Sequence, residues 1–95
     1  MEIKNAYKQK MAAQLKEWNA QIDLLEAKVE NIGADIKVKR AEALKELRSK
    51  QRTASKKLIE LESASSDAWE QVKETAEQVW DDLKAGIAAA QSKFK

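Results

Sequence analysis

The acidic side chains after residue 69 are the ones whose spacing could support chemistry. They recur every three or four residues, so a helix would place their carboxylates on one face. Carboxylate oxygens suit hard divalent cations, but the surrounding sequence supplies neither a glycine-bearing loop nor a histidine. We therefore predict no metal site and no cofactor, and interpret the acids as partners of lysines and arginines on a neighbouring helix. The row consists of Glu70, Glu74, Glu77 and Asp81, with Asp82 beside it.

A basic segment, Lys45 to Lys57, is the counterpart of this acidic row and could bind phosphates. Residues 36–57 carry a net charge of +7 and residues 58–83 one of −7. A free basic helix would bind nucleic acid in a salt-dependent way, but the acidic segment would fold back onto this one. We therefore predict neutralisation within the chain and disfavour nucleic acid as a partner.

Three tryptophans, Trp18, Trp69 and Trp80, could form a stacking platform for a ligand or anchor the chain at a membrane surface. All three fall on apolar helical stripes, which predicts instead that they fill the interior of a bundle. The chain also has no histidine, no cysteine and no glycine-rich phosphate loop. We predict that the protein is not an enzyme and has no catalytic residues.

Composition indicates the fold class. The chain has no proline, only two glycines and 36% charged residues, which is typical of a long helix or coiled coil. We predict one all-α domain over residues 1–95. No segment approaches the roughly 20 apolar residues of a membrane span, and the first residues lack the apolar stretch of a secretory signal. We therefore expect a cytoplasmic protein.

A turn at residues 63–67 divides the pattern into a long helix, residues 3–62, and a short helix, residues 68–94. Asp67 and Glu70 have the spacing of a capping box, in which each side chain accepts from the other's backbone amide, and we predict them as the helix cap. The two helices would pair as an antiparallel helical hairpin with a coiled-coil seam. The predicted hairpin core consists of Ile36, Leu44, Leu47, Leu58, Leu61, Trp69, Val72, Trp80, Leu83, Ile87 and Phe94.

Gly33 leaves two forms of this fold open. We favour a continuous long helix, because Val29 and Ile36 keep the heptad phase across Gly33 and one glycine inside a helix costs only about 1 kcal/mol. The N-terminal apolar stripe then has no partner in its own chain, so we predict an antiparallel homodimer with a three-helix bundle at each end. The alternative is a monomeric three-helix bundle with a turn at residues 31–35. The predicted oligomer interface consists of Tyr7, Met11, Leu15, Trp18, Ile22, Leu25, Val29 and Ile32.

Two local patterns carry a resemblance to known proteins. Residues 14–23 read QLKEWNAQID, and residues 66–70 read SDAWE, with Trp80, Leu83 and a terminal SKFK further on. In these patterns the whole chain resembles a group of short bacterial coiled-coil proteins of about this length. The resemblance implies an all-helical fold and a continuous first helix, but no activity. The eleven-residue step from Trp69 to Trp80 bears a weaker resemblance to exchangeable apolipoproteins and late-embryogenesis-abundant proteins.

We predict from these features a non-catalytic structural or interaction protein, a small scaffold or adaptor associated with stress or with the cell envelope. Its expected partners are a second copy of itself and another protein. One alternative is a peripheral protein that binds a lipid surface through the amphipathic segment 69–94, although the acids on its polar face are unusual for such helices. The other alternative is a nucleic-acid-binding accessory protein.

Overall fold

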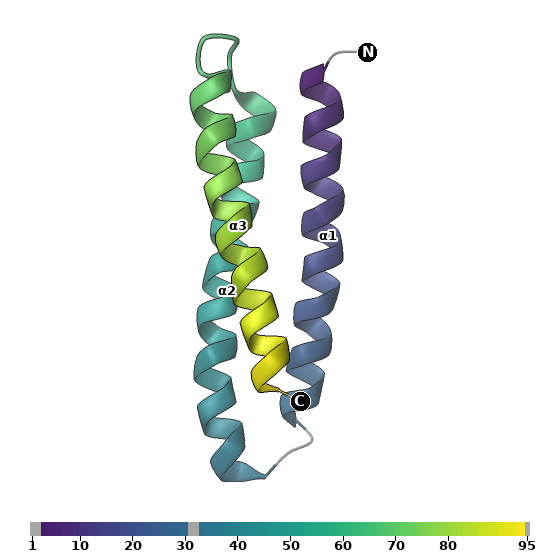
Figure 1. Cartoon of the computed structure of the whole chain (residues 1–95), viewed down its shortest axis with the longest axis vertical. Coiled ribbons are helices and arrows are strands. Elements are labelled where there is room, and N and C mark those ends of the chain that lie inside the picture. Colours follow the sequence, from purple (N-terminus) through teal and green to yellow (C-terminus); the bar gives the residue numbers. More distant parts are fainter. Residues whose placement is uncertain (1–2, 31–32, 95) are drawn as a thin grey trace.

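Three helices form a bundle that follows the apolar pattern of the sequence. The computed structural model describes residues 3–30 and 33–94, in which α1 spans Ile3–Glu30, α2 spans Ala34–Ser63 and α3 spans Trp69–Lys93. α1 and α3 run in the same direction, and α2 runs antiparallel to both (Figure 1). The rod is 51 Å long and 20 by 17 Å across. The all-α prediction is confirmed over the described residues.

The helical pattern breaks at Gly33, so the predicted continuous helix over residues 3–62 is wrong. Gly33 has an extended backbone, with φ −61° and ψ 153°, and its carbonyl accepts the Lys37 amide at 2.9 Å to begin α2. The break lets α1 fold back along α2 and α3. Each large apolar side chain buried in this way contributes about 1.5–3 kcal/mol, which outweighs the few helical hydrogen bonds given up. The three-helix alternative is therefore the arrangement observed, although its turn does not use a left-handed glycine.

The stripe predicted as an oligomer interface lies inside this single-chain bundle. The side chains of α1 pack into one hydrophobic cluster with those of α2 and α3, and so the stripe no longer requires a second chain to cover it. Its last member, Ile32, lies outside the described residues. The buried members are Met11, Leu15, Ile22, Leu25 and Val29, and Tyr7 and Trp18 are partly buried against them.

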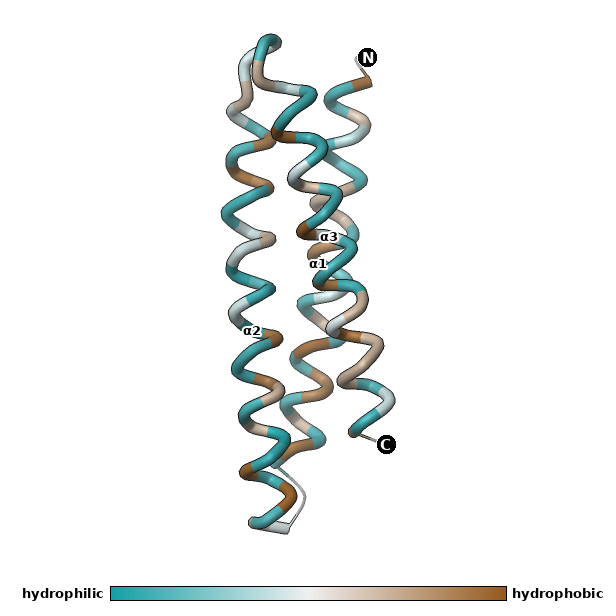
Figure 2. The backbone as a smooth tube through the Cα atoms, turned by 60° about the vertical axis from the view of Figure 1, so that its left-hand side comes forward, coloured by the Kyte–Doolittle hydropathy of each residue, from teal (hydrophilic) through white to brown (hydrophobic). Residues whose placement is uncertain are grey.

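The residues predicted for the hairpin core are buried or partly buried, with one exception. Ile36 is 51% exposed, as is its neighbour Val38 at 64%, because α3 is too short to cover the first turns of α2. The last described residue, Phe94, lies under the Arg40 guanidinium at 5.2 Å. Figure 2 shows hydrophobic bands along all three helices, and also at the end of α2 that α3 does not reach. The buried residues are Leu47, Leu61, Trp69, Trp80, Leu83, Ile87 and Phe94, with Leu44, Leu58 and Val72 partly buried.

In the connection between α2 and α3, hydrogen bonds to Ser65 take the place of the predicted capping box. α3 begins at Trp69, and Ala68 before it has helical angles, φ −89° and ψ −13°, with no side-chain cap. The Ala68 amide donates to the Ser65 hydroxyl at 3.3 Å and to the Ser65 carbonyl at 3.2 Å. The cap position is thus occupied by Ala68, whose side chain cannot accept a hydrogen bond, so the prediction of Asp67 and Glu70 as the cap is wrong.

Candidate functional site

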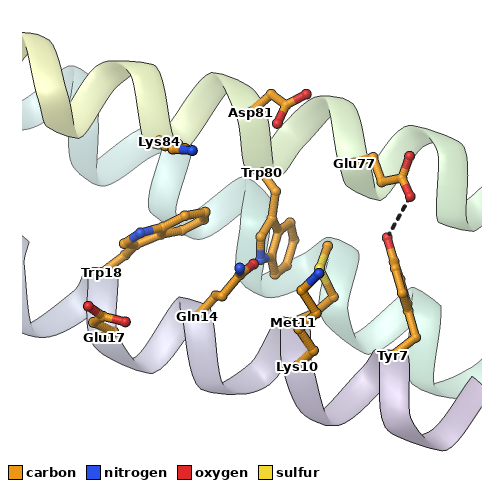
Figure 3. Close-up of a pocket in the computed structure, with 10 residues that line it drawn as sticks. All are labelled: Tyr7, Lys10, Met11, Gln14, Glu17, Trp18, Glu77, Trp80, Asp81 and Lys84. Carbon is orange, nitrogen blue, oxygen red and sulfur yellow. Dashed lines mark hydrogen bonds between the residues drawn. The ribbon is translucent and has the colours of Figure 1, made fainter.

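A groove of about 440 Å³ runs between α1 and α3 (Figure 3). Apolar and aromatic side chains line its interior, and charged side chains of both helices stand along its rims. All three described tryptophans are at least partly buried in the bundle, as the apolar stripes predicted. The interior of the groove is lined by Tyr7, Met11, Trp18 and Trp80, and its rims by Lys10, Gln14, Glu17, Glu77, Asp81 and Lys84.

Tyr7 closes one end of the groove with its hydroxyl protonated. The hydroxyl donates to a Glu77 carboxylate oxygen at 3.2 Å. Burial, followed by the charge of Glu77 and this hydrogen bond, raises the pKa of Tyr7 to about 12. The ring meets Trp69 edge-on, with centroids 5.8 Å apart and planes at 80°, and the Lys73 ammonium lies 5.3 Å from its centroid. Tyr7 is thus a packing residue near neutral pH, not an acid or base.

Trp80 lines the groove, and its indole N–H is a buried hydrogen-bond donor without a partner in the described part of the chain. Its ring lies 6.5 Å from that of Trp18. A buried donor without a partner costs about 1–3 kcal/mol. The Gln14 side chain lines the same groove beside the indole in Figure 3. The groove therefore offers apolar and aromatic contact surface, and its described residues supply no nucleophile with an adjacent base.

A polar cluster joins α1 to α2 on the other flank of α1. Arg48 donates to Asp23 at 2.9 Å and also to Glu26, and these hydrogen bonds raise the pKa of Arg48, that to Glu26 contributing most. The Gln51 side-chain amide donates to the side-chain oxygen of Asn19, Oδ1, at 2.5 Å. The sequence pattern does not predict this cluster, although Gln51 interrupts the apolar stripe. The signal available in the sequence was a pair of polar residues at inward-facing positions, Gln51 on α2 and Asn19 on α1.

The predicted pairing of acidic α3 with basic α2 is largely absent. Across the residues described, one ion pair joins these helices, between Lys50 and Asp82 at 3.4 Å. Arg48 pairs with α1 instead, and Lys57 pairs within α2. The acidic row is exposed, because the face of α3 that carries it turns away from α2. The prediction that α3 neutralises the basic segment is therefore wrong, apart from the pair between Lys50 and Asp82.

Five exposed cations of α2 have no side-chain ion pair or hydrogen bond within the described chain. Two of them, Lys37 and Lys39, lie near the start of the helix, and the other three lie in the basic segment: Lys45, Arg52 and Lys56. We call these last three the basic strip. They are spaced by seven and four residues, so they lie on one face of the helix. This face is directed away from the α2–α3 contact, which leaves the strip open to solvent.

Residues 3–30 and 33–94 contain neither a candidate metal site nor a candidate membrane span. No group of three or more carboxylate, histidine or cysteine side chains there is placed to hold a metal ion. None of the three helices has an apolar stretch long enough to cross a membrane. Comparison with protein-family models, curated proteins and solved structures finds no match.

Proposed function

We propose that this chain is a non-catalytic helical scaffold that assembles as a homodimer by exchanging α1 between two copies. The observation that carries the proposal is the single break at Gly33 between two helices whose apolar stripes continue in phase. If Gly33 becomes helical, α1 and α2 form one rod, and α1 packs on α2 and α3 of the partner. The same side chains are then buried as in the single chain, so the two forms differ mainly at the hinge.

The local geometry at Gly33 supports such an exchange. A Cβ added at this position would meet nothing within 4 Å, and its φ of −61° and ψ of 153° are open to any residue. The turn therefore does not depend on glycine. In the continuous helix, by contrast, glycine costs about 1 kcal/mol relative to alanine. The residue at position 33 thus tunes the balance between the two forms.

The exchanged dimer would have the shape of a spacer. Residues 3–63 as one helix measure about 90 Å at 1.5 Å per residue, compared with 51 Å for the folded single chain. A three-helix bundle would lie at each end. This geometry holds two identical surfaces a fixed distance apart, which is what a scaffold or adaptor requires.

Substitution of Gly33 tests the proposal. Gly33→Ala favours the continuous helix in both hinges of a dimer, which amounts to about 2 kcal/mol or about a thirty-fold larger association constant. Gly33→Pro fits the observed φ but costs about 2 kcal/mol more than glycine inside each helix, so it should weaken association about a thousand-fold. Light scattering on a sizing column and small-angle X-ray scattering measure the mass and the length.

A control separates hinge effects from general helix stabilisation. Ala20 is exposed in α1 and helical in both forms, so Ala20→Gly should leave the dimer fraction unchanged. A two-chain mass with a length near 90 Å for Gly33→Ala, lost in Gly33→Pro, would support the proposal. A compact single chain for Gly33→Ala up to millimolar concentration would refute it.

A further inference from the structure

The basic strip is an unusual feature for a helix whose remaining charges are largely balanced. Arg52 lies four residues from Arg48 and four from Lys56, so like charges are neighbours on the helix surface. Such pairs destabilise a helix slightly. Arg48 is relieved by Asp23 and Glu26 of α1. Arg52 and Lys56 have no such partner in the described residues, so their mutual repulsion is not offset by an ion pair within the fold.

A fourth cation extends the strip across the seam to α1. Lys16 lies two turns before Asp23 on the same face of α1, and Asp23 is the residue that bonds Arg48 across the seam at 2.9 Å. The antiparallel pairing continues at Asn19 with Gln51. Lys16 is therefore placed beside the C-terminal half of the strip. It is exposed and makes no ion pair with any described residue.

Acids bound the strip without covering it. Glu42 lies one turn before Lys45, and Glu60 lies one turn after Lys56, where Lys57 holds it at 2.7 Å. Between these acids, Lys45 and Lys56 are separated by about 16 Å along the helix at 1.5 Å per residue. One strand of a nucleic-acid duplex presents several phosphates over that length.

We propose that the basic strip, with Lys16, binds the phosphate backbone of a nucleic-acid duplex. A duplex is preferred to a single strand because the strip has no aromatic side chain on which bases could stack. The tryptophans that could stack are buried or half-buried on the opposite side of the bundle. Contacts to phosphates alone carry no sequence information, so binding is independent of sequence. The site does not depend on the exchange of α1.

Fluorescence anisotropy with a labelled DNA duplex of about 20 base pairs tests the site. Four phosphate contacts predict a slope of about −3.5 for log affinity against log salt, and about a hundred-fold loss of affinity between about 50 and 200 mM salt. The triple variant Lys45→Gln, Arg52→Gln, Lys56→Gln should bind the duplex at least about ten-fold more weakly. Its slope of log affinity against log salt should be less negative by about 3. All three residues are exposed, so the variant should fold, and circular dichroism provides the check.

A matched variant controls for net charge. Lys10→Gln, Lys84→Gln, Lys93→Gln removes three exposed cations from α1 and α3 and gives the same net charge. Retained binding in this control, together with loss in the strip variant, would support the site. Equal losses in both variants, or no binding at low salt, would overturn it. Equal or tighter binding to single-stranded DNA, or to vesicles of phosphatidylglycerol, would also overturn the assignment to a duplex.

Discussion

Replacing Trp80 with phenylalanine is expected to leave stability nearly unchanged, although the residue is only 3% exposed. Two effects oppose each other. The smaller ring loses roughly 40 Å² of buried apolar surface, or about 1 kcal/mol. It also leaves a cavity worth about 1 kcal/mol. The substitution removes the indole N–H, which has no partner and costs about 1–3 kcal/mol where it is buried. The terms therefore cancel to within about 1 kcal/mol.

Trp69 provides the matched comparison, because it is buried to a similar extent. Its indole nitrogen is not among the buried atoms without a partner, and the Lys4 and Lys8 ammonium groups lie 5.5 and 5.7 Å from its ring. Trp69→Phe should therefore lose about 2 kcal/mol with no compensating gain. For a chain of this length, that difference lowers the melting temperature by about 8–16 °C relative to Trp80→Phe.

Thermal and urea unfolding followed by circular dichroism measure both variants without relying on tryptophan fluorescence. If Trp80→Phe is as destabilising as Trp69→Phe, the indole N–H has a partner in solution and the reasoning is refuted. Gln14, which lines the same groove, would then be the first residue to substitute.

Two further predictions concern the remaining polar contacts. The pKa of Tyr7 is raised from 10.0 to about 12, so the folded chain keeps this proton to a higher pH than the unfolded chain does. The free energy of unfolding should therefore fall as the pH rises from about 10 to about 12. In unfolding measurements over this pH range, Tyr7→Phe should lack the fall. Gln51→Leu should cost more than Asn19→Leu, because Gln51 also accepts from Arg48 at 2.9 Å and keeps that hydrogen bond when Asn19 is replaced; the double variant should cost less than the sum of the two single variants. Urea unfolding in a double-mutant cycle checks this, and strictly additive losses would contradict it.

Residue periodicity predicts burial well in this chain because burial depends mainly on which face of a helix a residue occupies. Leu47, Trp80 and Leu83 are buried as the stripes predicted. Ile36 lies on the same face but is exposed, since its burial depends on where another helix ends. The sequence pattern specifies which face of a helix points inward. How far along the helix that face is covered depends on the lengths of the neighbouring helices in the assembled bundle.

The break at Gly33 could not be predicted in the same way. A continuous helix in the proposed exchanged dimer and a turn in the single chain would bury the same apolar stripes, so the hydrophobic pattern does not distinguish these two forms. The small difference lies in one glycine, worth about 1 kcal/mol. Charge pairing was equally beyond the sequence. Lys50 meets Asp82 while Arg48 meets Asp23 because each projects from a different flank of α2, and the packing of the bundle decides which helix lies on which flank.

The two ends of the rod are secured unequally. Near the α2–α3 connection, Lys4 donates to the Ser66 hydroxyl at 3.5 Å and Lys8 to the Glu62 carbonyl at 3.2 Å. At the opposite end α3 stops short, and the first turns of α2 expose Ile36. Local opening needs the least free energy where apolar contacts are fewest and backbone amides are most exposed to water. We therefore expect local opening to begin at the uncovered first turns of α2, near Ile36, and to reach the α2–α3 connection last.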